Sequence, residues 1–135
     1  MAAKTITLAC SVAGLALATI AYRAVAHHSF SAEFDANKPV KMTGTVTKLE
    51  WQNPHTWFYV DVKDDSGNVV NWGFELASPN LLLRNGWTRS SMKVGDAVTV
   101  EAYQAKNGLS LANAHAVTLV GGKTLLAGSS KGNAP

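Results

Sequence analysis

Two neighbouring runs of this 135-residue sequence alternate apolar and polar residues with a period of two. Within residues 56–63 and 70–76, the apolar residues that recur at every second position are Phe58, Val60, Val62, Val70, Trp72, Phe74 and Leu76. The alternation predicts two strands that each bury one face, because successive side chains of a strand point to opposite sides of the sheet. The turn-forming segment Asp64-Asp65-Ser66-Gly67-Asn68 joins the runs, so we expect an antiparallel hairpin.

Further β-prone runs lie on either side of this hairpin, with turn signals between them. Residues 41–51 precede the breaker Asn53-Pro54, a fourth run begins after Gly95-Asp96, and a fifth covers residues 111–119. Short strands at such intervals predict a small β-barrel or β-sandwich.

A single short helix is expected between the third and fourth runs. Ser78 is a suitable N-cap, Pro79 suits the first helical position, and Gly86 marks the end of about two turns. Three leucines, Leu81, Leu82 and Leu83, would pack this helix against the strands.

Three strands, a helix and two more strands form the element order of an OB-like Greek-key barrel. The first run supports this fold, because its apolar residues change from even positions, Met42 and Val46, to odd positions, Leu49 and Trp51. Such a change indicates a bend or bulge in a strand that serves both halves of a barrel. We therefore predict an all-β fold of five to six strands, with a sandwich as the alternative.

The amino terminus has the organisation of a signal peptide. Lys4 lies in a short basic start, residues 6–21 form an apolar run, and Ala24-Val25-Ala26 matches a cleavage site for small residues. We expect cleavage after Ala26 and a periplasmic or secreted protein with no stable membrane insertion. An uncleaved anchor is the alternative reading.

Cleavage would leave one domain, residues 27–127, followed by a disordered tail over residues 128–135. It removes Cys10, the only cysteine, and leaves ten basic and nine acidic residues, a net charge of +1. The mature domain would therefore hold neither a disulfide nor a thiolate metal site. Without a basic run it lacks the charge pattern of a nucleic-acid-binding protein. It also lacks a nucleophile motif and a phosphate loop, so we do not expect an enzyme.

Three histidines are candidate metal ligands. Cleavage after Ala26 would make His27 the first residue, so that its α-amino group and imidazole could both bind a metal. His28 and His55 could add further nitrogens, which would favour Cu(II) or Zn in the absence of cysteine. The alternative is structural: a polar leader at residues 27–28 before Phe30 and Phe34 dock on the barrel, and a turn histidine at position 55. His115 is expected to be half-buried on the face of Val117.

A second candidate site uses aromatic residues for an unknown small ligand or periplasmic protein. Trp57 and Tyr59 should point away from the apolar face of their strand, where they could stack on a ligand. Trp87 and Arg84 are the further candidates, with Arg84 and Arg89 flanking Gly86-Trp87 as a possible anion clamp. The alternative is that these rings complete the core.

Several short motifs in a fixed order resemble the DUF6152 family of small exported bacterial proteins of unknown function. They are His27-His28-Ser29-Phe30, Phe34-Asp35, Gly44-Thr45-Val46, Trp51-Gln52-Asn53-Pro54-His55, Trp72-Gly73-Phe74-Glu75, Ser78-Pro79-Asn80, Arg84-Asn85-Gly86-Trp87-Thr88-Arg89 and Gly95-Asp96. The resemblance covers nearly all of the mature chain and implies a signal peptide and a compact β domain, with no established activity. The family pattern includes His27, His28 and His55, but not His115.

Overall fold

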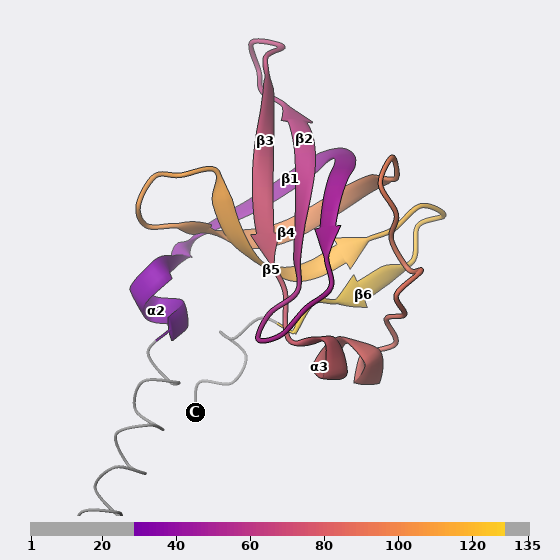
Figure 1. Cartoon of the computed structure of the whole chain (residues 1–135). Helices are drawn as coiled ribbons and strands as arrows, with labels where there is room; N and C mark the ends of the chain where they lie inside the picture. Colours follow the sequence, from indigo (N-terminus) through magenta and orange to yellow (C-terminus); the bar gives the residue numbers. More distant parts are fainter. Residues whose placement is uncertain (1–28, 129–135) are drawn as a thin grey trace, which may run out of the picture.

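The computed structural model describes residues 29–128. The predicted signal peptide, His27, His28 and the predicted tail beyond Gly128 lie outside that range. The described residues form two short helices and six strands (Figure 1), which are α2 (Ser29–Glu33), β1 (Phe34–Glu50), β2 (Trp57–Lys63), β3 (Val69–Glu75), α3 (Pro79–Arg84), β4 (Ala97–Ala105), β5 (Leu111–Thr118) and β6 (Thr124–Leu126).

The strands close into a barrel. Their order is β3-β2-β1-β4-β5-β6, and a further parallel pairing between β3 and β5 joins the two ends of the five-stranded part. This arrangement, with α3 between β3 and β4, is the Greek-key topology of an OB fold. The barrel predicted from the sequence is therefore confirmed, and β6 extends it by pairing with β5.

The first strand is long because it pairs with two partners. It begins at Phe34, seven residues before the predicted start, since its first half pairs with β4 and its second half with β2. The register with β2 shifts between Val46 and Lys48, which is the bulge that the change of apolar positions predicts. Gly44 lies where strands approach closely: a Cβ there would be 2.2 Å from the carbonyl oxygen of Asp61.

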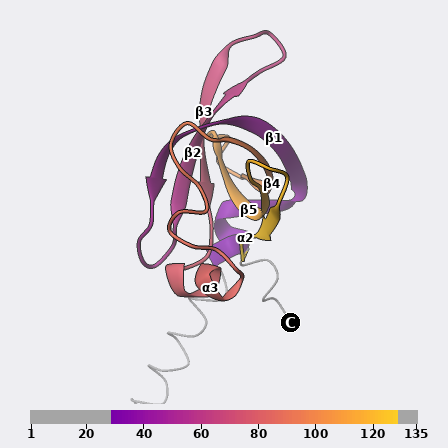
Figure 2. The same cartoon turned by 90° about the vertical axis from the view of Figure 1, so that its right-hand side faces the viewer.

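A hydrophobic core fills the barrel. Helix α3 covers one end of the barrel (Figures 1 and 2). Both rings of the β2–β3 pair, Phe58 and Phe74, stack at 5.3 Å between centroids and are fully buried. Leu82 of α3 is also fully buried. The predicted packing role of Leu83 is wrong, because this side chain is 50% exposed on the outer side of the helix. Ser78 precedes the helix as predicted, but its side chain makes no capping hydrogen bond.

A bulge in β5 places His115 differently from the prediction. The pairing with β4 runs Ala114 to Ala102 and then Ala116 to Glu101, so His115 is the extra residue. The bulge puts His115 beside Glu101 and the ring of Tyr103, and not on the buried face of Val117. The imidazole is half-buried, as predicted, and stacks on Tyr103 at 5.1 Å between centroids.

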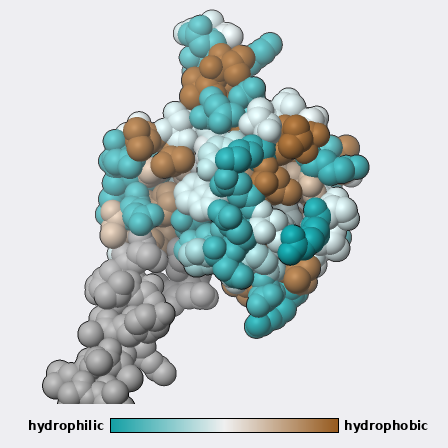
Figure 3. Space-filling view, viewed as in Figure 1, coloured by the Kyte–Doolittle hydropathy of each residue, from teal (hydrophilic) through white to brown (hydrophobic). Residues whose placement is uncertain are grey.

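The β2–β3 hairpin extends beyond the barrel (Figure 1) and carries one of several apolar patches on this face (Figure 3). Val69 in this hairpin is exposed. Between residues 29 and 128, neither helix combines the length and apolar character needed to cross a bilayer.

Candidate functional site

The β1–β2 loop carries His55 to the end of β3. Thr56 fixes this position through two backbone hydrogen bonds, because its N–H donates to Ala77 (3.0 Å) and its carbonyl accepts from Leu76 (2.8 Å). His55 lies one residue before Thr56, and Glu75 one residue before Leu76. The loop therefore brings the imidazole of His55 against the carboxylate of Glu75, with 3.5 Å between Nδ1 and Oε2.

Glu75 is an acidic residue with little access to solvent. The residue is 7% exposed, and its Oε1 accepts a hydrogen bond of 3.0 Å from the Nδ2 of Asn113 on β5. Burial raises the pKa of Glu75 above its usual range, although the charge of His55 and the Asn113 hydrogen bond oppose this rise. The charge of Glu33, at the end of α2, raises this pKa further. The site thus combines an imidazole, a buried carboxylate and a second carboxylate nearby.

The short helix α2 packs against the barrel beside β4 and the β4–β5 loop. The ring of Phe30 lies 5.8 Å from those of Phe34 and Tyr103, which confirms that the segment docks through these phenylalanines. Lys106, at the start of the β4–β5 loop, donates its backbone N–H to the carbonyl of Glu33 (2.9 Å) and its ammonium to that of Ser31. The position of α2 is therefore set by both rings and polar contacts.

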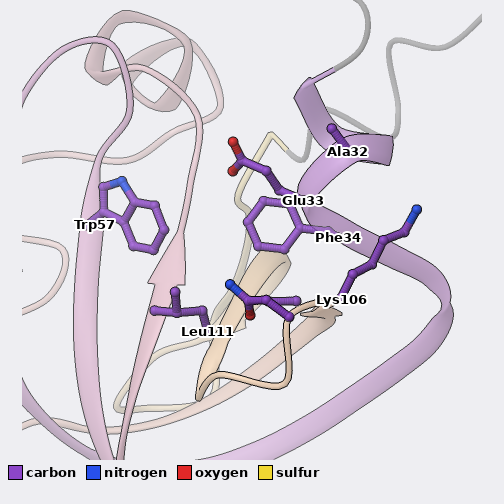
Figure 4. A pocket seen from close by; sticks show the side chains of 8 residues that line it. Ala32, Glu33, Phe34, Trp57, Lys106 and Leu111 are labelled. Atoms are coloured by element: carbon purple, nitrogen blue, oxygen red, sulfur yellow. The ribbon is translucent and has the colours of Figure 1, made fainter.

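A cavity of about 530 Å³ lies between α2, β2 and the β4–β5 loop (Figure 4). Its lining consists of Ala32, Glu33, Phe34, Trp57, Ala105, Lys106, Asn107 and Leu111. The volume is within the range of pockets that take small organic ligands. In OB folds the β1–β2 and β4–β5 loops border the usual ligand face, and here these loops carry His55 and Lys106 respectively.

The predicted aromatic site is only partly assembled. Trp57 lines the cavity. Tyr59 lies two residues along β2, where its hydroxyl donates to Glu50 (3.3 Å) and the ammonium of Lys48 lies 5.2 Å from its ring centroid. Tyr59 thus contacts Glu50 and Lys48 and is not among the residues that line the cavity.

Trp87 and Arg84 lie away from the cavity. Trp87 is 3% exposed and its Nε1 donates to the carbonyl of Leu126 (2.8 Å), so the ring belongs to the core and offers no ligand surface. This corrects its assignment as a ligand-binding residue. Arg84 is exposed in the last turn of α3, and the guanidinium carbon of Arg89 lies 5.9 Å from the ring centroid of Trp51.

Of the three predicted metal ligands, the structure places His55, whereas His27 and His28 lie outside the described residues. Within residues 29–128 there is no group of three or more His, Cys, Asp or Glu side chains arranged to hold a metal. Glu75 was missed as a site residue, because its alternating strand assigned it to the polar face. Its neighbour Asn113 is 38 residues further along the chain, so no local pattern reveals the pair.

The closed five-stranded barrel, with a helix after its third strand and a cavity at the loop-bordered face, defines the protein as a small OB-type domain. The chain belongs to the family described as a family of unknown function (DUF6152), whose pattern matches residues 14–114. No curated protein matches the sequence.

Several solved structures are similar to the barrel at low sequence identity. The mitochondrial single-stranded DNA binding protein Rim1 from S. cerevisiae has a TM-score of 0.48 and 11% identity, over 64% of this chain and 94% of that one. The N-terminal domain of PriB from Thermoanaerobacter tencongensis has a TM-score of 0.42 and 21% identity, over 62% and 97%. A mutant of TiaS in complex with agmatine has a TM-score of 0.46 and 19% identity, over 64% of this chain but 22% of that one.

Proposed function

We propose that this protein is exported and binds Cu(II) or Zn at a site formed by the α-amino group and imidazole of His27, with His28 and His55. The observation that carries the proposal is the orientation of His55. Its Nδ1 faces the buried carboxylate of Glu75, and among the described residues its Nε2 has no hydrogen-bond or ion-pair partner. Nε2 is thus the nitrogen left for a metal.

A carboxylate on the far nitrogen is the usual support of a metal-binding histidine. It fixes the tautomer and the direction of the ring, and it makes the other nitrogen a better donor. Glu75 is suited to this role because Asn113 holds its second oxygen and the surrounding barrel limits its movement. His55 itself is 38% exposed, which leaves room for an ion to approach.

The attachment of α2 supports the participation of the amino terminus. Residue 28 is bonded to Ser29, the first residue of a five-residue helix that ends at Glu33, whose charge raises the pKa of Glu75. A helix rises by about 1.5 Å per residue and consecutive Cα atoms are about 3.8 Å apart, so the backbone of residue 28 is within about 10 Å of that of Glu33. A mature chain that begins at His27 would carry two residues before this helix, and we propose that these two residues reach the His55–Glu75 pair.

The donor set favours the two metals named. After cleavage the chain holds no cysteine, so nitrogen and oxygen are the available ligands. Imidazole and amine nitrogens suit Cu(II) and Zn, whereas Cu(I) prefers thiolates and thioethers. We propose binding or delivery of the metal and not catalysis, since the chain carries no recognisable catalytic motif.

The test uses the full-length chain expressed in a bacterial host and recovered from the exported fraction. Its intact mass should correspond to cleavage after Ala26. Titration with copper and zinc should then show a tight site that weakens about tenfold or more in His55→Ala and when one alanine is inserted before His27. His115→Ala is the matched control and should bind as the wild type does. Equal affinity in the insertion variant, or no tight site in the cleaved protein, would refute the proposal.

A second function is favoured by the cavity beside Trp57. In that reading the protein is a binding module for a small ligand or another exported protein, and its histidines are structural. Trp57 supports it because its ring lines a cavity of about 530 Å³. Wild-type protein that binds no metal but binds an organic ligand would favour this reading.

A further inference from the structure

The free charge that faces the cavity is negative. Among residues 29–128 the carboxylate of Glu33 has no ion pair or side-chain hydrogen bond, and it points toward the side of the cavity on which Trp57 lies (Figure 4). Lys106 also lines the cavity, but its ammonium donates to the carbonyl of Ser31 and points away from Trp57. Lys106 therefore contributes its apolar stem, and Glu33 contributes the charge.

Apolar and aromatic groups form the remaining walls. Trp57 and Phe34 bring rings to the cavity, and Leu111, Ala32 and Ala105 bring aliphatic carbon. The indole of tryptophan attracts a cation over its face more strongly than any other side-chain ring. A carboxylate, an indole and aliphatic walls around one space complement a ligand that carries a positive charge on an apolar body.

We propose that this cavity binds a substituted ammonium ion, with its charge between the Glu33 carboxylate and the Trp57 ring and its carbon substituents against Phe34 and Leu111. Such an ion needs few hydrogen-bond acceptors, since its charge is spread over its alkyl groups. This suits a cavity whose lining has few polar side chains besides Glu33, since the Oδ1 of Asn107 already accepts from the backbone N–H of Leu109 (3.0 Å). The site goes beyond the proposed metal site because it uses none of its histidines.

The experiment compares two probes of the same shape, choline and its uncharged carbon analogue 3,3-dimethylbutan-1-ol. Metal-free exported protein is titrated with each by calorimetry. Choline should bind with a dissociation constant below about 10 mM, and the analogue should bind about tenfold more weakly. Glu33→Gln keeps the size of the side chain and removes its charge, so it should lose about tenfold in choline affinity.

Two controls separate this site from other effects. Asp65→Asn removes an exposed carboxylate in the β2–β3 turn and should leave choline binding unchanged. His55→Ala should also retain choline binding, which distinguishes this site from the metal site. The proposal is overturned if choline and its analogue bind equally, if Glu33→Gln binds choline as the wild type does, or if choline does not bind in the stated range.

Discussion

Replacement of His55 by alanine tests the pair on which the metal site is built. The variant leaves the buried Glu75 carboxylate with Asn113 but without its imidazole partner at 3.5 Å. A hydrogen bond to a charged group contributes about 1.5–3 kcal/mol. Because the His55 side chain is 38% exposed, solvent screens this pair, and we expect a loss of about 1 kcal/mol in the free energy of unfolding. For a domain of this size the loss corresponds to a fall in Tm of about 4 °C.

The assay is a double-mutant cycle on metal-free protein at pH 7, with urea and thermal unfolding of the wild type, His55→Ala, Glu75→Gln and the double variant. Glu75→Gln keeps an oxygen for Asn113 and removes the charge that His55 faces. Removal of His55 should therefore cost little in the Glu75→Gln background, with a coupling energy of about 1 kcal/mol. A coupling below about 0.3 kcal/mol would show that the two side chains do not support each other, and the reasoning would fail.

Two further predictions concern pH and packing. Burial raises the pKa of Glu75, so the folded protein retains a proton that the unfolded chain releases; the stability due to this group is present below the usual value of 4.5 and is lost as pH rises through the folded pKa. For metal-free protein, the free energy of unfolding should therefore fall less steeply from pH 4 upward in Glu75→Gln than in the wild type. Equal pH slopes for the two proteins would contradict the assignment. Gly44→Ala should lose about 3 kcal/mol, since its Cβ would meet the carbonyl oxygen of Asp61 at 2.2 Å. A drop in Tm of less than about 4 °C would mean that β1 and β2 separate easily there.

The strands and the bulge of β1 could be predicted because they are local patterns. Alternation in residues 56–63 and 70–76 fixes one buried face for each strand, and the change of apolar positions around Thr47 marks the bulge. The start of β1 could not be predicted in the same way. Residues 35–39 are mostly polar and include Pro39, and this irregular stretch belongs to β1 because Phe34 and Pro39 pair with Ala105 and Tyr103 of β4. Helix α2 was also missed, since five residues are too few for a helical period.

The candidate site depends on contacts that no local pattern contains. Glu75 follows the alternation of an exposed position, but it is buried because Trp57 and Asn113 are its neighbours on the adjoining strands. A bulge likewise turns His115 away from the face that a regular strand would give it. From the sequence, Trp87 is a candidate ligand-binding residue. In the fold its Nε1 donates to the carbonyl of Leu126 in β6, which makes the ring part of the core. In each case a residue far away in the sequence decides the outcome.

The most direct test of the proposed function is a structure of the exported protein loaded with Cu(II) or Zn, with the metal located by its anomalous scattering. We predict a metal about 2.0–2.1 Å from the Nε2 of His55 and from the amino nitrogen and imidazole of His27, with Glu75 still on Nδ1 of His55. A metal bound elsewhere, or a loaded protein in which the Nε2 of His55 carries no metal, would contradict the proposed site.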